Sequence, residues 1–392
     1  MPPLRTLLAV PVSLALLAVA PVASTTPPTP APAAATTSPA LATAPATDAD
    51  AATDAILPLL LTQGHAPAAA LLTREESGSA GQPGTFEASS AVGPSVQTRT
   101  VSTHYAQAGQ GIARADHFRA GSITKTFIAT VVLQLAAEHR LSLDDTVDQH
   151  LPGLVRGAGN DGRTMTLRAL LTHTSGLNDF TIDTKGVVPL SPLQAVRIAL
   201  THPPAGPGRY YYSNTDYVLL GMVIQQVTGD SYAAEAERRI IAPLGLTGTS
   251  FPGSRISLPS PHGRAYAADG TDVTELDPRV AGAAGELVST LADLDRFYAA
   301  LLGGELLPPR RLREMLDTRT AHGLYGMGLF PEKLSCGVTV WGHNGRINGS
   351  YVRTAATVDG RRVLTFRVNT TAIADPDLEP ALLAAEFCPR TS

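Results

Sequence analysis

The stretch RAGSITK at residues 119–125 leads directly into residues 126–138, which are apolar on nearly every side of a helix. A helix without a polar stripe is expected to be buried at the centre of a domain. A serine and a lysine three positions apart share one helix face, so the Ser122 hydroxyl and the Lys125 amine are expected to meet. The stretch therefore predicts a buried central helix that carries two reactive groups at its start.

The pair at residues 122 and 125 is suited to nucleophilic chemistry. A serine hydroxyl becomes a strong nucleophile only when a base removes its proton. Burial lowers the pKa of a lysine, and the neutral amine can then act as that base. The competing interpretation is a chance S-x-x-K with Lys125 in solvent. Of 30 basic residues, however, only Lys125, Lys185 and Lys333 are lysines, and arginine does not deprotonate in proteins.

Two further clusters carry polar side chains that suit a catalytic site. Tyr212-Ser213-Asn214 follows a loop rich in Gly and Pro. A tyrosine there can transfer a proton when a cation lowers its pKa, and Asn214 offers both a donor and an acceptor. Packing and helix capping are the alternative roles of this cluster. The second cluster is His343-Asn344-Gly345 in a strand, where His343 supplies a donor and glycine gives a substrate access to the strand edge.

The pattern of apolar residues predicts an α+β fold. Strands are expected near both ends of the chain, at residues 68–73, 97–108, 338–341, 350–358 and 362–369, with Asp359-Gly360 as a two-residue hairpin turn. Helices are expected at residues 167–171, 192–200, 216–227, 231–240, 290–302 and 380–387. We therefore expect one antiparallel sheet formed from both chain ends with flanking helices, and an inserted, mostly helical region at about residues 140–285.

The first residues predict export. Residues 1–24 have a basic start, an apolar stretch and small residues at the end, as a signal peptide does. A transmembrane anchor is the alternative, but the apolar run is short and interrupted by proline. Residues 25–52 are almost entirely Thr, Pro, Ala and Ser, which predicts a disordered linker. We expect the folded domain to span residues 53–392, in a secreted, soluble protein without a stable membrane anchor.

The two cysteines fit an exported protein. Cys336 lies in a strand-like run and Cys388 lies near the end of the chain. In an oxidising compartment they are expected to form a disulfide that ties the last helix to the sheet, while two separate buried thiols are the alternative.

Composition excludes several classes of function. A net charge of −4 with 5% aromatic residues gives no basic or base-stacking surface for nucleic acid. The histidines are dispersed and only two cysteines are present, so no metal and no cofactor are expected. No G-x-S-x-G motif occurs either, which disfavours the hydrolases that carry their serine nucleophile in that motif.

In their order and spacing, the three clusters resemble the motifs of the penicillin-recognising serine hydrolases, which comprise serine β-lactamases, D-alanyl-D-alanine carboxypeptidases and related esterases. The resemblance extends from about Ile56 to Cys388. It includes FRAGS at residues 118–122, LLTHTSGL at residues 170–177 and SCG at residues 335–337. The motifs are most similar to those of secreted carboxypeptidases of actinobacterial type.

The resemblance implies a β-lactamase/transpeptidase-like fold and acyl transfer through Ser122, with Lys125 and Tyr212 moving the proton. Which of these two side chains is the base stays open. The oxyanion hole would be formed by the backbone N–H groups of Ser122 and Arg346. His173 falls in a segment that is structural in the family. The implied protein is a monomer that acts on a peptide, β-lactam or ester, and the implied substrate-binding residues are Asn214, His343, Asn344, Gly345 and Arg346.

The sequence departs from the resembling carboxypeptidases where they bind a substrate carboxylate. Those enzymes use an arginine just upstream of the Ser-Cys-Gly segment and a threonine in the middle of the third motif. Here the upstream stretch has Lys333 beside Glu332, and the middle residue is Asn344. Lys333 or Arg346 would have to replace that cation, because a carboxylate without one binds weakly. An esterase with an apolar acyl pocket around Phe330 is therefore a second candidate. A non-catalytic binding protein is disfavoured, because all three motifs keep reactive residues.

Overall fold

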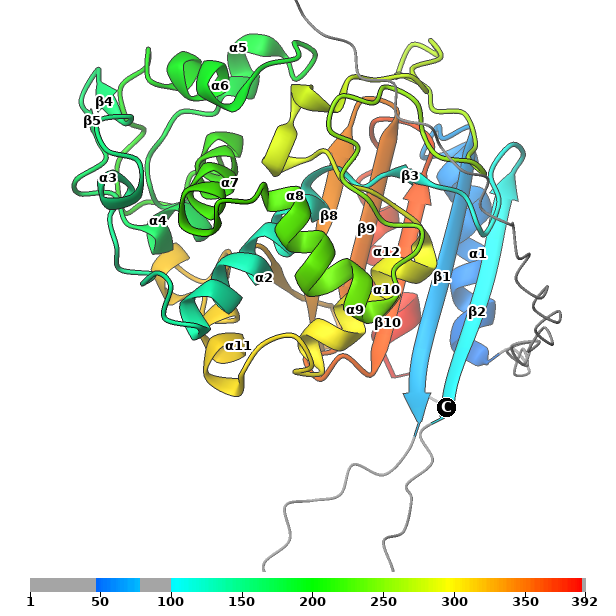
Figure 1. Ribbon diagram of the computed structural model, residues 1–392. Helices are drawn as coiled ribbons and strands as arrows, with labels where there is room; N and C mark the ends of the chain where they lie inside the picture. Colours follow the sequence, from blue (N-terminus) through cyan, green and yellow to red (C-terminus); the bar gives the residue numbers. More distant parts are fainter. Residues whose placement is uncertain (1–46, 78–99, 390–392) are drawn as a thin grey trace, which may run out of the picture. The chain divides into compact units, whose positions relative to one another are not determined.

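Both ends of the chain contribute strands to one six-stranded antiparallel sheet (Figure 1). The computed structural model describes residues 47–77 and 100–389. The strand order is β2-β1-β10-β9-β8-β7, so the α+β prediction is confirmed. The strands are β1 (Ala68–Ser77), β2 (Thr100–Gly109), β7 (Phe330–Lys333), β8 (Thr339–Ile347), β9 (Ser350–Ala356) and β10 (Arg362–Val368).

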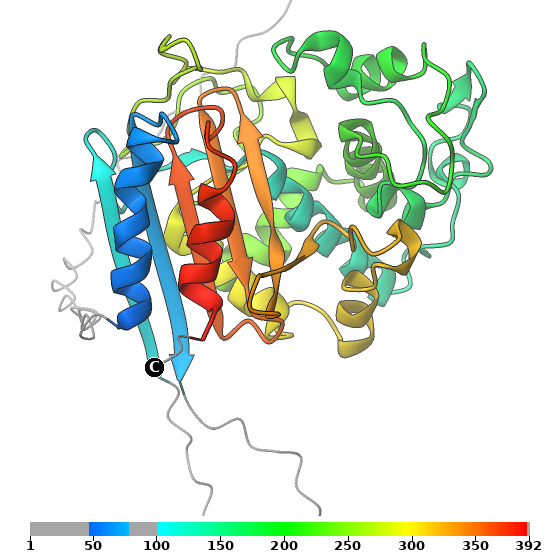
Figure 2. The same cartoon turned by 180° about the vertical axis from the view of Figure 1, so that it is seen from behind.

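Helices cover both faces of the sheet. Figure 2 shows α1 (Asp48–Thr62) and α12 (Leu378–Phe387) on one face, and Figure 1 shows α2 (Thr124–Ala137) and α10 (Leu291–Leu302) on the other. The pleat of β1 supplies both layers, since Leu71 packs in the cluster with α1 and α12 and Leu72 packs with α2. A strand buried on both faces reads as a continuous apolar run, as residues 68–72 do.

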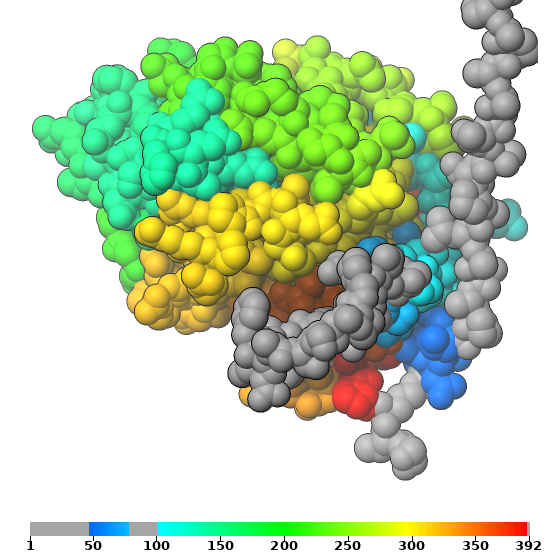
Figure 3. Space-filling model, turned by 60° about the horizontal axis from the view of Figure 1, so that its bottom comes forward, coloured from blue at the N-terminus to red at the C-terminus, as the bar shows by residue number. Residues whose placement is uncertain are grey.

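The predicted central helix is α2. It is buried along nearly its whole length, and Phe127 stacks on Phe297 of α10 with ring centroids 3.7 Å apart. In Figure 3 yellow atoms, the colour of the segment that contains α10, lie between the green surface of the helical region and the orange and red atoms of the C-terminal part. Because α2 is enclosed by the sheet side and by helices, its start can hold groups away from water. A 3₁₀ turn, η1 (Gly121–Ile123), precedes it and carries Ser122.

The region between α2 and α10 is mostly helical, as the sequence predicts. Thr166 and Ser191 cap their helices, and Gly229 ends α7 with a φ of 84°. The region contains α3 (Val147–His150), α4 (Leu167–Leu171), α5 (Phe180–Thr184), α6 (Pro192–Ala199), α7 (Asn214–Thr228), α8 (Tyr232–Ala236), a π-helical turn (Glu237–Ile241), α9 (Ala242–Leu244), η3 (Pro278–Val280) and η4 (Gly282–Ala284).

The remaining elements are short. They are β3 (Phe118–Arg119), β4 (Arg156–Gly157), β5 (Asn160–Asp161), β6 (Val288–Ser289), α11 (Pro309–Met315) and η5 (Arg319–Ala321).

Ordered structure begins earlier than expected. Helix α1 starts at Asp48, so residues 48–52 of the predicted linker are helical. The signal is a capping box, in which the Thr47 side chain accepts from Asp50 N and the Asp50 carboxylate accepts from Thr47 N. The predicted signal peptide, residues 1–24, and linker residues 25–46 lie outside the described residues. Within the described ranges, no helix is both long enough and apolar enough to cross a membrane.

Three local predictions about the last strands need correction. The β9–β10 connection is longer than two residues, because the pair Thr357 N to Arg362 O encloses residues 358–361 and Gly360 takes a φ of 70°. Strand β8 extends to Ile347 and not only to Trp341. Cys336 lies in the turn between β7 and β8, not in a strand.

The Cys336–Cys388 disulfide is present, with Cα atoms 5.9 Å apart. It joins the β7–β8 turn to the end of α12, so the predicted pairing is confirmed.

Candidate active site

Ser122 and Lys125 face each other at the start of the central helix. Lys125 Nζ lies 3.1 Å from Ser122 Oγ. The other two contacts of the amine are Asn214 Oδ1 at 2.8 Å and the Ala284 carbonyl at 2.7 Å. Lys125 is fully buried, whereas Ser122 is partly exposed. The predicted meeting of hydroxyl and amine is therefore observed, with the amine inside the protein and Ser122 partly exposed.

Burial changes the protonation of Lys125. It lowers the pKa of the amine from 10.5 to about 7, while the nearby carboxyl groups of Asp179 and Asp216 act in the opposite direction. A neutral amine has two hydrogens and one lone pair. Asn214 Oδ1 and the Ala284 carbonyl can only accept, so they take both hydrogens. The lone pair then points to the Ser122 hydroxyl, which is the arrangement a base requires.

Two glycines let the end of β8 lie directly against η1. A Cβ on Gly345 would lie 1.9 Å from the Ala120 carbonyl oxygen, and one on Gly121 would lie 2.8 Å from Arg346 N. Gly121 also has a φ of 51°, a left-handed conformation that favours glycine. The close approach brings the backbone N–H of Arg346 beside the turn that carries Ser122. This is the position at which the family resemblance implies the second oxyanion donor.

Tyr212 lies on the other side of the reactive pair. Tyr212 is half-buried, and Lys125 Nζ is 4.9 Å from the centroid of its ring. Burial raises the pKa of Tyr212, although a hydrogen bond with Ser122 acts in the opposite direction. The phenol is therefore neutral, and it can pass a proton on but does not provide a phenolate base.

Asn214, at the first turn of α7, holds the lysine in place. Its Oδ1 accepts from Lys125, and its Nδ2 donates to Asp179 Oδ2 at 2.9 Å and to Thr181 Oγ1 at 3.2 Å. Both hydrogens of the amide are thus engaged by protein groups. From the sequence we expect Asn214 to offer them to a substrate, but in the structure they are directed to α5 and its N-cap.

His343 is buried and neutral. Burial lowers its pKa to about 3, with the charge of Lys125 acting in the same direction. Its Nδ1 contacts the Asn344 carbonyl, which only accepts, so Nδ1 carries the proton and Nε2 accepts from the Tyr325 hydroxyl at 2.8 Å. Its ring lies 6.4 Å from the ring of Tyr212. The three predicted motifs therefore meet, with His343 supported by a tyrosine that the motifs do not include.

Asn344 and Arg346 point away from this cluster. Successive side chains of a strand alternate between faces, so these two share a face opposite to that of His343 and Gly345. Asn344 Nδ2 donates to Tyr351 Oη at 3.3 Å, and Tyr351 contacts Glu379 of α12. From the sequence we expect the Asn344 side chain to contact the substrate. Its hydrogen bond to Tyr351 directs it elsewhere and does not support that contact.

A buried polar cluster behind Tyr212 is missed by the motifs. The His173 ring lies 4.4 Å from the Tyr212 ring, and His173 Nδ1 lies 2.8 Å from Asp216 Oδ2. Burial lowers the pKa of His173 and raises that of Asp216. Ser175 Oγ donates to the other oxygen of Asp216 at 2.5 Å. The run THTS at residues 172–175 is the sequence signal, but alone it does not indicate a partner 43 positions away.

Metal ligation has no visible support among residues 47–77 and 100–389, where no group of three or more His, Cys, Asp or Glu side chains could hold an ion.

The sheet, the buried central helix and the serine–lysine pair at its start define a β-lactamase-like fold with its site between sheet and helical region. A family model described as Beta-lactamase matches residues 83–386. The chain belongs to this family. By sequence it is 32% identical over 215 residues to Penicillin-binding protein 4 of Amycolatopsis lactamdurans, a match that covers 51% of this chain and 54% of that protein. The chain thus spans about half the length of this relative.

Solved structures match over more of their length. A D-stereospecific amidohydrolase from a Streptomyces species is similar with a TM-score of 0.74 and 39% identity, over 87% of this chain and 99% of that chain. The D-amino acid amidase of Ochrobactrum anthropi SV3, complexed with D-phenylalanine, is similar with a TM-score of 0.70 and 26% identity, over 86% and 99% of the two chains.

Proposed function

We propose that this protein is a secreted serine hydrolase that cleaves amides of D-amino acids through an acyl-enzyme on Ser122. The observation that carries the proposal is the set of hydrogen bonds made by Lys125. Two acceptors take the hydrogens of the neutral amine, so its lone pair faces the Ser122 hydroxyl. A neutral amine in this position is a general base next to a nucleophile.

Acylation begins when the Ser122 oxygen attacks the substrate carbonyl carbon and Lys125 takes the hydroxyl proton. The carbonyl oxygen becomes an oxyanion between the backbone N–H groups of Ser122 and Arg346. Loss of one such donor typically costs ~2.7–4 kcal/mol of transition-state stabilisation. The C–N bond then breaks, and the leaving amine receives a proton through the neutral Tyr212 phenol, which Lys125 reprotonates. Water releases the acid by the same steps in reverse.

Charge near the site favours a substrate that ends in a neutral carboxamide. Arg353 is buried and pairs with both Glu332 at 3.0 Å and Glu379 at 3.1 Å, so its charge is already compensated. Lys333 is exposed at the far end of β7, and the Arg346 side chain shares the face of Asn344. Among the described residues, none of these three cations is free and directed at the site to bind a terminal carboxylate, which disfavours the carboxypeptidase reaction. The similarity to the Streptomyces D-stereospecific amidohydrolase supports the amide instead.

The test compares five substrates with purified full chain: D-phenylalanine amide, its L enantiomer, a peptide ending in D-Ala-D-Ala, a chromogenic cephalosporin and a short-chain nitrophenyl ester. We expect the D-amide to be hydrolysed with a kcat/KM at least about tenfold above that of the L-amide. Faster turnover of the peptide, the cephalosporin or the ester would assign carboxypeptidase, β-lactamase or esterase activity instead and overturn the substrate proposal.

A second measurement tests the nucleophile separately from the substrate. A fluorescent penicillin should label Ser122, as located by mass spectrometry of the digested protein. Ser122→Ala should lose the label and all hydrolysis, whereas Ser254→Ala, a matched change at an exposed serine, should keep both. Intact hydrolysis by Ser122→Ala would refute the acyl-enzyme on this residue.

A further inference from the structure

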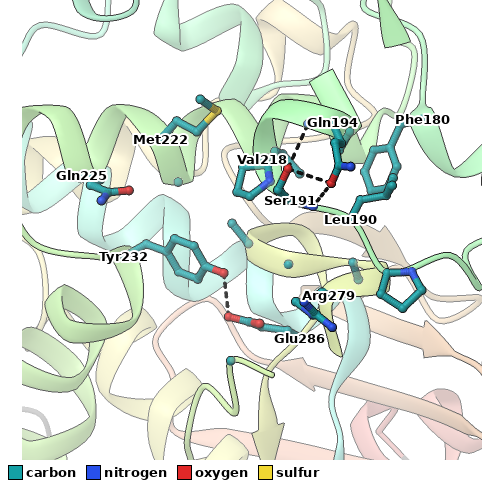
Figure 4. A pocket seen from close by; sticks show the side chains of 18 residues that line it. Phe180, Leu190, Ser191, Gln194, Val218, Met222, Gln225, Tyr232, Arg279 and Glu286 are labelled. Atoms are coloured by element: carbon teal, nitrogen blue, oxygen red, sulfur yellow. Dashed lines mark hydrogen bonds between the residues drawn. The ribbon is translucent and has the colours of Figure 1, made fainter. Parts of the chain in front are cut away.

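A cavity lies in the helical region and is bordered by η4 (Figure 4). It has a volume of about 410 Å³ and lies between α6, α7, α8 and the segment 278–286. Its walls are largely apolar, with Phe180, Leu190, Val218 and Met222 among the lining residues. Ser122, Lys125 and Tyr212 do not line it. Its size is that of pockets that hold small organic ligands.

One buried carboxyl group stands out among these apolar walls. Glu286 is 4% exposed, and its Oε1 accepts a hydrogen bond from Tyr232 Oη at 2.7 Å. Figure 4 shows the two side chains meeting at the edge of the cavity. Within the described ranges, the Tyr232 hydroxyl is the hydrogen-bonding partner of this carboxyl group. Burial raises the pKa of Glu286 to about 7, although the bond from Tyr232 acts in the opposite direction.

The cation that lines the cavity is already engaged. Arg279 donates from Nε to Asp277 Oδ1 at 3.0 Å and from Nη2 to Asp277 Oδ2 at 2.5 Å. Its guanidinium is thus neutralised by a carboxylate outside the cavity lining. An ionised Glu286 therefore has one hydroxyl donor and no compensating charge, a costly state for a buried carboxylate.

We propose that this cavity binds a small apolar molecule that carries a primary ammonium group. The ammonium would lie against the free oxygen of Glu286 and form the ion pair that the protein itself does not supply. The apolar part would fill the space between Phe180, Val218 and Met222. Because Ser122, Lys125 and Tyr212 do not line the cavity, this site is distinct from the one around Ser122, although η4 borders both.

The test uses 2-phenylethylamine as the probe and isothermal calorimetry on the full chain. We expect saturable binding of one equivalent, and binding of the uncharged analogue 2-phenylethanol at least about tenfold weaker. The affinity for the amine should rise from about pH 6 to about pH 8, as Glu286 ionises. Tyr232 and Arg279 are the other titratable side chains that line the cavity.

Variants locate the probe. Glu286→Gln keeps the volume and a hydrogen-bonding group, and should weaken amine binding at least about tenfold. Glu237→Gln, the same change at an exposed position, should leave it unaltered. A crystal soaked with the amine should show it beside Glu286, and circular dichroism checks that each variant is folded. Equal binding by Glu286→Gln, equal affinity for the alcohol, density in front of Ser122 or no binding at all would each overturn the proposal.

Discussion

Replacing Lys125 with methionine tests two properties of the buried amine: its role as a base and the free-energy cost of burying its charge. Methionine is unbranched and apolar, so it fills the space of the lysine stem without an ionisable group. The substitution removes the base proposed for Ser122, and we expect kcat/KM to fall by about 10²–10⁴. It also removes a buried amine whose protonation depends on pH, and this second effect has a calculable size.

The lowered pKa of Lys125 fixes the sign and the magnitude of the stability effect. Moving the pKa from 10.5 in the unfolded chain to about 7 in the folded protein corresponds to a cost of roughly 5 kcal/mol for the buried ammonium. Between these two values the unfolded chain binds more protons than the native state. The cost is therefore fully present below about pH 7 and is relieved as the pH rises toward 10.5.

The assay is urea denaturation of wild type and Lys125→Met from about pH 6 to about pH 10. We expect the unfolding free energy of wild type, measured relative to that of the variant, to increase by about 1.4 kcal/mol for each pH unit above pH 7. Asn214 and the Ala284 carbonyl lose a partner in the variant, but this loss is the same at every pH and leaves the slope unchanged.

Lys333→Met is the matched control, because Lys333 is exposed and the same side chain is exchanged. Its difference from wild type should stay flat across the pH range. A flat difference for Lys125→Met as well would refute the lowered pKa, and with it the argument that a substantial fraction of the buried amine is neutral near pH 7.

Three further variants test separate parts of the structure. Tyr212→Phe removes the proton relay and should slow acylation by about 10²–10⁴ in stopped-flow labelling, with little change in the thermal midpoint. Gly345→Ala should place a methyl group 1.9 Å from the Ala120 carbonyl oxygen; we expect a loss of about 1–3 kcal/mol in unfolding free energy, and a fall in kcat of about 10² as the oxyanion donor moves. An unchanged kcat would contradict that placement. Replacing both Cys336 and Cys388 with serine opens a link between residues 52 positions apart and should lower stability by about 4 kcal/mol, as measured by urea denaturation.

The sequence was sufficient where the cause is local. Thr166 and Ser191 precede helices that they do cap, and the S-x-x-K spacing places Lys125 beside Ser122 by helix periodicity alone. The sequence did not suffice to predict features whose local signal is weak or ambiguous. The capping box that starts α1 lies in a stretch that otherwise reads as linker, and the hairpin after β9 uses a longer loop than its Asp-Gly pair indicates.

The tertiary structure alone decided how the reactive groups are held. Lys125 receives its other two partners from residues 89 and 159 positions away, so no local pattern could state that its lone pair faces Ser122. The same holds for Asn214, whose amide is occupied by α5 and its N-cap, and for Asn344, which the pleat directs to the α12 side. Residue types and short spacings therefore determine which chemistry is present and on which element it begins. Burial and long-range hydrogen bonds determine its protonation and direction, because both arise only when distant segments pack together.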